Sequence, residues 1–276
     1  MDYFRNFHLM VTPFVPPIYN NNSRTLLGMI HNLGLSTSLN FVLDAADTRS
    51  YDGSSQTWTD PVSANNFFLG ADVTATATDP TFNGTAGLAT EATYFSFDGG
   101  DYFTETTTHT FADEWHKNNG AFTIVALLYA TNGASSRFIF GNTDGSGTDG
   151  IGIGFDSTEK VFVAHPPTNA STEIIGPAAT ALTADSWNFV ALSFDEATTT
   201  ARFHTNSVVD SVSMTASTAT DANPNVLRIG ATGAATFPLG SGERLAGIAG
   251  WSTAISEASV TNLYNLLKAR RFTSLP

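Results

Sequence analysis

The chain has 276 residues, of which 42% are hydrophobic and only 13% are charged, and its formal net charge is −13. An acidic surface repels nucleic acid and anionic bilayers, so we expect no nucleic-acid partner. Because cysteine is absent, disulfides, thiolate metal sites and a cysteine nucleophile are excluded. The length suits one large domain, and no run of about 18 apolar residues predicts membrane insertion.

The first 22 residues combine aromatic side chains with Pro13, Pro16 and Pro17. The prolines favour an extended backbone, so this segment is either a frayed tail or an arm that packs on a neighbour. Disordered segments usually lack large apolar residues, and we therefore favour the arm. The side chains expected to dock on a partner are Tyr3, Phe4, Phe7, Met10, Phe14 and Tyr19.

A helix is predicted next, with Ser23 as its cap and Gly34 as its end. Together with the arm it forms a predicted docking segment over residues 1–38, followed by a β-sandwich domain over residues 39–276. The start of the sequence lacks the basic and apolar regions of a signal peptide, so we expect synthesis in a cytoplasm.

The stretch from Thr93 to Glu105 is the centre of the predicted sheet structure. Two short runs alternate large apolar and small polar residues, which suits strands with one buried face. The intervening glycines of Asp98-Gly99-Gly100-Asp101 can adopt positive φ, so the pattern predicts a β-hairpin corner. Asp98 and Asp101 are expected to hydrogen-bond the turn, and they are also candidates for contacting a ligand or Ca²⁺.

About thirteen short strands are expected along the chain, which requires two packed sheets and therefore a β-sandwich. Residues 121–130 are apolar on both faces, as in a central strand that is covered on both sides. We interpret Trp58 as core packing rather than as a sugar platform. Further strands are expected at residues 39–44, 137–142, 151–156, 160–165, 187–195, 201–205, 207–214, 226–230 and 245–251.

One clear helix is predicted near the end, with Ser256 as its cap and an apolar face that includes Val260 and Leu267. Lys268, Arg270 and Arg271 crowd its negative end, and we interpret this basic cluster as helix capping rather than as an anion site.

Several short motifs follow one another in a characteristic order along the chain: Leu43-Asp44-Ala45-Ala46, Phe97-Asp98-Gly99-Gly100-Asp101-Tyr102, Phe122-Thr123-Ile124-Val125, Phe140-Gly141-Asn142 and Trp187-Asn188-Phe189-Val190-Ala191. In this order they resemble the concanavalin A-like lectin/glucanase superfamily, in the laminin G-like branch found in phage and bacterial surface proteins. The resemblance spans about residues 39–271 and implies a jelly-roll sandwich of two antiparallel sheets. It also implies binding of glycan or protein, sometimes with Ca²⁺, although the fold does not carry a ligand over.

No catalytic residues are predicted. The glucanases of the superfamily use Glu-x-Asp-x-x-Glu along one strand, and this spacing does not occur here. Zinc-protease, serine-nucleophile and phosphate-loop motifs are absent as well, so we predict a protein that is not an enzyme. The best Ca²⁺ candidate is the loop that contains Asn142, Asp144 and Asp149, with a solvated hairpin loop as the favoured alternative.

The low charge, the apolar arm and the lectin-like sandwich together favour a virion structural protein, either a capsid decoration or a tail or fibre component. Its expected partners are capsid or tail proteins of the same particle and a host-surface glycan, with many copies per assembly. The alternative is a free carbohydrate-binding module, with or without Ca²⁺. A glycoside hydrolase ranks third.

Overall fold

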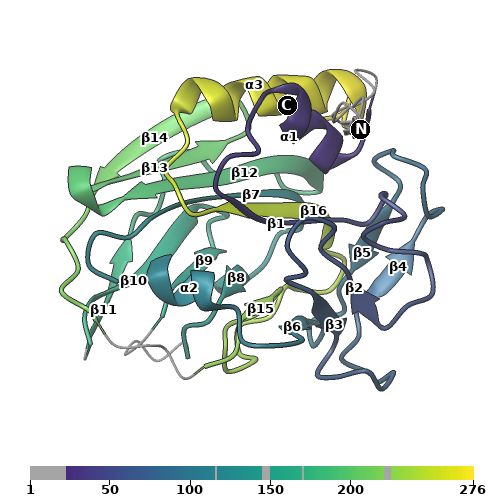
Figure 1. Ribbon diagram of the computed structural model, residues 1–276, viewed down its shortest axis with the longest axis horizontal. Coiled ribbons are helices and arrows are strands. Elements are labelled where there is room, and N and C mark those ends of the chain that lie inside the picture. The colour runs from purple at the N-terminus through teal and green to yellow at the C-terminus, as the bar shows by residue number, and fades with distance from the viewer. Residues whose placement is uncertain (1–22, 116, 145–149, 170, 221–224) are drawn as a thin grey trace, which may run out of the picture.

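The computed structural model describes residues 23–115, 117–144, 150–169, 171–220 and 225–276. They form a sandwich of two antiparallel eight-stranded sheets, with helices over one outer face (Figure 1). This confirms the predicted all-β jelly-roll architecture. The six aromatic and methionine side chains expected to dock on a partner lie outside the described residues, so their docking stays a prediction.

The first sheet has the order β14-β13-β12-β7-β16-β5-β4, and β1 pairs with β16 next to β5. At its centre, β7 and β12 pair along all ten residues of each strand. Its strands are β1 (Leu39–Asp44), β4 (Thr81–Asn83), β5 (Tyr94–Ser96), β7 (Ala121–Ala130), β12 (Ser186–Asp195), β13 (Thr200–Thr205), β14 (Val208–Ser213) and β16 (Arg244–Trp251).

The second sheet has the order β11-β10-β9-β8-β15-β6-β3-β2, so β8 to β11 form a meander in which consecutive strands are neighbours. Its strands are β2 (Thr57–Trp58), β3 (Phe67–Leu69), β6 (Phe103–Glu105), β8 (Arg137–Gly141), β9 (Gly152–Phe155), β10 (Val161–Thr168), β11 (Ser171–Ile175) and β15 (Arg228–Ile229). A short 3₁₀ helix, η1 (Glu196–Thr198), follows β12.

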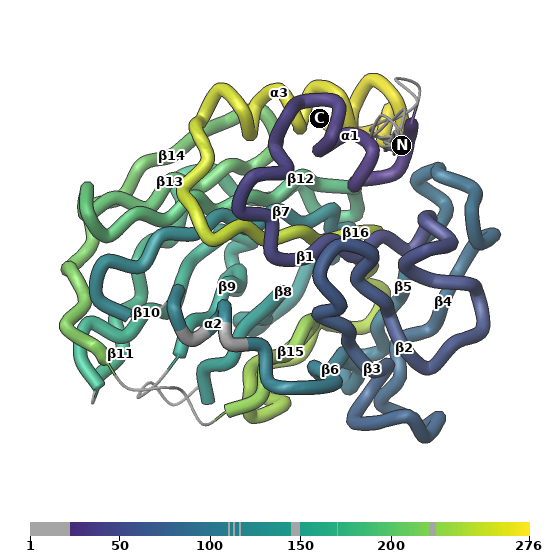
Figure 2. The backbone as a smooth tube through the Cα atoms, viewed as in Figure 1, coloured from purple at the N-terminus to yellow at the C-terminus, as the bar shows by residue number. Residues whose placement is uncertain are grey.

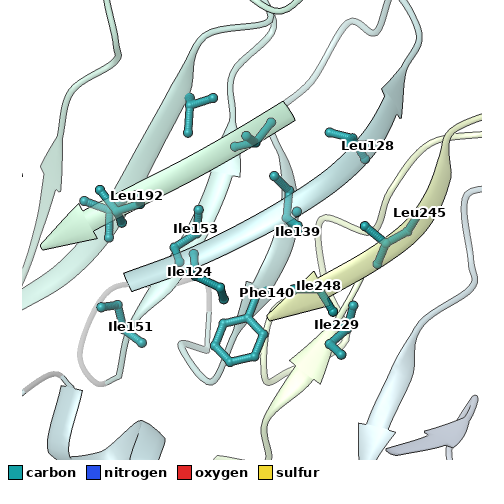
Figure 3. Close-up of a cluster of buried hydrophobic side chains, with 14 of the residues drawn as sticks. Ile124, Leu128, Ile139, Phe140, Ile151, Ile153, Leu192, Ile229, Leu245 and Ile248 are labelled. Carbon is teal, nitrogen blue, oxygen red and sulfur yellow. The ribbon is translucent and has the colours of Figure 1, made fainter. Parts of the chain in front are cut away.

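The core lies between the two sheets. Ile124, Leu128 and Leu192 point from the first sheet toward Ile153 and Phe140 of the second (Figure 3). On β7, Ile124 and Leu128 face this core, whereas Val125 and Leu127 face the helices on the other side, as the two-residue period of a strand requires.

Trp58 is part of this core, as predicted. It is fully buried, and its ring centroid lies 4.9 Å from that of Phe95 and 4.8 Å from that of Phe103. It therefore contributes to sandwich packing and offers no surface to a ligand.

The hairpin predicted at Asp98 to Asp101 is wrong. β5 before the turn pairs with β4 and β16 in the first sheet, whereas β6 after it pairs with β3 and β15 in the second. Phe95 and Phe103 both enter the core, where their ring centroids lie 5.0 Å apart in an edge-to-face arrangement. Because this packing holds the two strands in opposite layers, the turn is a corner between the sheets.

Helices α1 (Leu26–Asn32) and α3 (Glu257–Arg270) cover the outer face of the first sheet. They lie side by side, so the purple start of the described chain meets its yellow end (Figure 2). Thr25, rather than the predicted Ser23, caps α1 by accepting a hydrogen bond from the Gly28 amide. The apolar side of α1 is thus buried on its own domain, and β7 is covered on both faces, as predicted.

The short helix α2 (Thr110–Trp115) precedes β7 and inserts Trp115 into the core, where it stacks on Phe122. Within the described ranges, no helix combines the length and the hydropathy needed to span a bilayer.

Arg271 has a different role from the predicted helix capping. Its Nη1 donates to both carboxylate oxygens of Asp44, at 2.8 and 2.9 Å, and both side chains are fully buried. Asp44 also accepts hydrogen bonds from the amides of Leu26 and Ala46. The pair therefore connects α1, β1 and the end of α3, and we call it the Asp44–Arg271 pair.

We predict that the protein loses stability in mild acid because of His204. It lies on β13 opposite Ala191, on the sheet face that the helices cover, and burial followed by repulsion from Arg202 lowers its pKa from 6.5 to about 4. The unfolded chain thus binds more protons than the folded one between these values, so stability is complete above pH 6.5 and is lost as the pH falls toward 4. The expected loss is on the order of 2–3 kcal/mol.

Urea denaturation of the wild type and His204→Leu at pH 7 and pH 4.5 measures this step. The variant should lose less stability than the wild type between the two pH values, because its side chain has no proton to bind. Equal losses would contradict the assignment.

Candidate functional site

A cavity of about 330 Å³ opens at the end of the sandwich where β5 and β7 end and β16 begins. Its lining comes from Gly99, from the loop between Thr131 and Arg137, and from the segment between Phe237 and Ser241. Ligand pockets in proteins usually measure about 300–1,000 Å³, so this cavity suits a small ligand.

The wall of the cavity contains Arg137, the first residue of β8. Its Nη2 lies 2.5 Å from Glu159 Oε1 and its Nη1 lies 2.8 Å from Glu243 Oε1, and all three side chains are buried. The contact with Glu243 has the distance of an ion pair but is out of line for a hydrogen bond. The guanidinium also lies 4.4 Å from the ring centroid of Phe155. We call Arg137, Glu159 and Glu243 the buried charge cluster.

Gly133 makes room for this cluster. A Cβ atom there would lie 1.9 Å from Nη1 of Arg137, so any other residue would displace the guanidinium. The Gly133 amide also donates to Glu159 Oε1 at 3.1 Å, and the Gly240 amide donates to Glu243 Oε2 at 2.6 Å. The two loops of the cavity are thus tied to the charge cluster by their backbones.

One guanidinium faces two carboxylates, so the cluster carries one excess negative charge when both are ionised. Burial is the main reason that the pKa of Glu243 is raised to about 7, against the opposing attraction of Arg137. A carboxyl pair of which one member holds a proton near neutral pH is the arrangement that glycosidases use. Here a guanidinium contacts both carboxylates, and neither of them is among the residues that line the cavity.

Phe237 is the exposed aromatic residue at the cavity. Its side chain is 45% exposed, and its φ of 51° lies in the left-handed region that bulky residues rarely adopt. The backbone around it is fixed: its carbonyl accepts from the Phe138 amide, and the Leu239 amide donates to Gly230. An exposed ring held in a strained conformation by its neighbours points to a function.

Small polar side chains complete the cavity. Thr131, Asn132, Ser135, Ser136 and Ser241 supply hydroxyl and amide groups that can both donate and accept hydrogen bonds. An aromatic platform with a few such groups is the usual composition of a site that orients a polar ligand.

The predicted residues Asp98 and Asp101 lie in the turn whose Gly99 borders the cavity. Asp98 Oδ1 accepts from the Gly100 amide, and Asp101 Oδ2 accepts from the Asp98 amide, both at 2.9 Å. Burial, reinforced by the charge of Asp98, raises the pKa of Asp101 to about 7 against the amide hydrogen bond. Both carboxylates therefore stabilise the turn, and their contact with a ligand remains a prediction.

The predicted Ca²⁺ loop lies elsewhere. Asn142 follows the last residue of β8, whereas Arg137 is its first, so the loop and the cavity lie at opposite ends of that strand. Asn142 Oδ1 accepts from the Ile151 amide and thereby closes the base of the loop. Asp149 lies outside the described residues, and in the described ranges no three His, Asp or Glu side chains are grouped to hold a metal. Ca²⁺ binding by Asp144 and its loop remains a prediction.

Sequence reasoning missed Arg137, Glu159, Glu243 and Phe237. One signal was available: with only 13% charged residues, an arginine that opens an apolar strand (Arg137) is unusual. A second was the Phe237-Pro238 pair in a segment otherwise rich in small residues.

Comparisons with known proteins agree on the fold. Residues 97–261 match the family model of the concanavalin A-like lectin/glucanases superfamily. Trypanosoma rangeli sialidase in complex with sialic acid is similar at a TM-score of 0.54 and 13% identity, over 85% of this chain and 33% of that one. No curated protein sequence gives a significant match.

Two botulinum neurotoxin structures are similar as well, each at a TM-score of 0.56 and 12% identity. One is a structure of botulinum neurotoxin type C, whose cell entry depends on interaction with two ganglioside molecules. It matches 83% of this chain and 51% of that one. The binding domain of neurotoxin DC in complex with SialylT matches 84% and 52%. The chain thus spans about a third of the sialidase and half of the toxin chains, and at these identities the likeness shows the fold alone.

The prediction that the protein is not an enzyme is corrected by these comparisons. It rested on the absence of the glucanase carboxylate spacing and of the zinc-protease, serine-nucleophile and phosphate-loop motifs. The fold, however, is shared with chains of sialidases, which are enzymes. A missing motif of one enzyme group therefore does not exclude activity in a chain of this architecture.

Proposed function

Since the chain belongs to the concanavalin A-like lectin/glucanase superfamily, we propose that it binds glycan in the cavity beside Phe237. The observation that carries the proposal is the exposed, strained Phe237 ring next to a small cavity that is rich in hydroxyl and amide groups.

The groups that line the cavity are complementary to those of a sugar. A pyranose ring has an apolar face of C–H groups, which can pack on an aromatic ring, and a rim of hydroxyl groups. Ser135, Ser136 and Asn132 can donate to and accept from those hydroxyls, which fixes the orientation of the ring. The backbone hydrogen bonds on both sides of Phe237 hold the platform in place before a ligand arrives, which reduces the entropy cost of binding.

The similar structures support a glycan as the ligand class. One toxin structure concerns cell entry through gangliosides, the other is a complex with SialylT, and one sialidase structure contains sialic acid. Chains of this architecture therefore include proteins that engage carbohydrate.

We further propose that the sandwich is displayed on a particle, as a capsid decoration or a tail or fibre component in which residues 1–22 contact a neighbouring protein. What supports this role is the sequence: an arm rich in aromatic residues and proline, combined with a low charge content. Because the apolar side of α1 packs on its own sandwich, we assign that contact to residues 1–22 rather than to α1.

Replacing Phe237 with alanine should weaken glycan binding by about five- to thirty-fold, because loss of the ring removes about 1–2 kcal/mol of stacking. A glycan array identifies the ligand, and isothermal titration then measures its Kd for the wild type and the variant. Ile174→Ala is the matched control: that side chain is 56% exposed, and it lies on β11, away from the cavity.

Both variants should unfold at nearly the wild-type temperature, because each removes an exposed side chain. If the Kd changes equally in both variants, or in neither, the cavity is not the glycan site.

A further inference from the structure

We infer that the cavity selects neutral sugars and rejects sugars that carry a carboxylate, sulfate or phosphate group. This inference rests on the proposed glycan-binding function and names its ligand class. It follows from the charges around the cavity.

The wall of the cavity offers no free positive charge to a ligand. Among the residues found to line the cavity in the described ranges, only Arg137 is charged. Recognition of an anionic sugar usually relies on an arginine whose guanidinium is free to form a bidentate pair with the anion. Arg137 is not free, since its two terminal nitrogens face Glu159 and Glu243 at 2.5 and 2.8 Å.

The buried charge cluster has more carboxylates than guanidinium groups. The two glutamates match or exceed the charge of the one arginine, so the buried charge cluster presents no net positive charge to a ligand. An anion would lose its hydration on entry and gain no opposing cation in return, which makes its binding unfavourable. The aspartates of the neighbouring 98–101 turn and the net charge of −13 oppose it as well.

The guanidinium itself is withheld from a ligand. Arg137 is buried, and its Nε has no hydrogen-bond partner among the described residues. The polar groups that the cavity offers to a ligand are therefore neutral hydroxyl and amide groups, which come from Thr131, Asn132, Ser135, Ser136 and Ser241.

The test compares matched glycans on one array: lactose and N-acetyllactosamine in neutral, sialylated and sulfated forms. The neutral form should bind at least about ten-fold more tightly than either acidic form. Its Kd should change little between 50 mM and 500 mM NaCl, because a neutral ligand makes no screened charge contact.

Glu243→Gln provides a second readout. At pH 8, where Glu243 is mostly ionised, it removes one negative charge. The glutamine can still accept from the Gly240 amide, so the ratio of neutral to acidic affinity at this pH should fall by several-fold. A wild-type preference for the acidic forms would overturn this inference alone. Absence of binding to every glycan would overturn the proposed function, and this inference with it.

Discussion

Replacing Arg137 with alanine should lower the free energy of unfolding by about 3–5 kcal/mol, since removing one partner of a buried ion pair leaves the other uncompensated. Here two carboxylates are left, Glu159 and Glu243, and both are buried. Denaturation with guanidinium chloride at pH 8 measures the loss. Arg24→Ala is the control, because Arg24 is exposed and its removal should change stability by less than about 0.5 kcal/mol.

The stability that Arg137→Ala loses relative to the wild type should become smaller as the pH falls. Glu243 has its pKa raised to about 7 in the folded state, so its contribution to stability is complete below its unfolded value near 4.5 and is lost as the pH rises through 7. Without the arginine the charged form becomes still less favourable, which makes the deficit larger at pH 8 than at pH 5. Equal deficits at both pH values, or a loss below about 1 kcal/mol, would contradict a buried charge cluster.

Breaking the Asp44–Arg271 pair should have an effect of similar size. Arg271→Ala strands a buried carboxylate, and Asp44→Ala strands a buried guanidinium together with the amides of Leu26 and Ala46, so each should cost about 3–5 kcal/mol. Urea denaturation of both single variants and the double variant measures the coupling.

The double variant should lose less than the sum of the two single losses, by about 1–3 kcal/mol, because it removes both charges together. Strict additivity would show that the two side chains act independently, in conflict with their 2.8 Å contact.

The sequence predicted the long elements of the fold well. β7, β12 and β16 each contain at least eight residues, long enough for their apolar pattern to be read, and α3 has a serine cap at Ser256. β2, β3, β4 and β11 were missed because they are only two to five residues long, and a period cannot be recognised over so few positions.

Other failures have their origin in long-range contacts. The alternation in the stretch from Thr93 to Glu105 correctly predicted strands with one buried face, which includes Phe95 and Phe103. Local spacing, however, does not reveal whether two strands pair with each other or with distant strands. The same holds for the site. Arg137, Glu159 and Glu243 are spread over more than 100 positions, and long-range contacts bring them together, among them the pairing of β7 with β16.

Among the described residues, the first strand pairs with the last, and this has a consequence for synthesis on the ribosome. β1 pairs with β16, and Asp44 contacts a residue 227 positions further along the chain. At translation rates of about 5–20 residues per second, β1 and the apolar side of α1 wait on the order of 10–45 s for their partners. During that time the nascent chain exposes an apolar surface of the kind that chaperones bind, and we expect the closure of so distant a contact to slow folding.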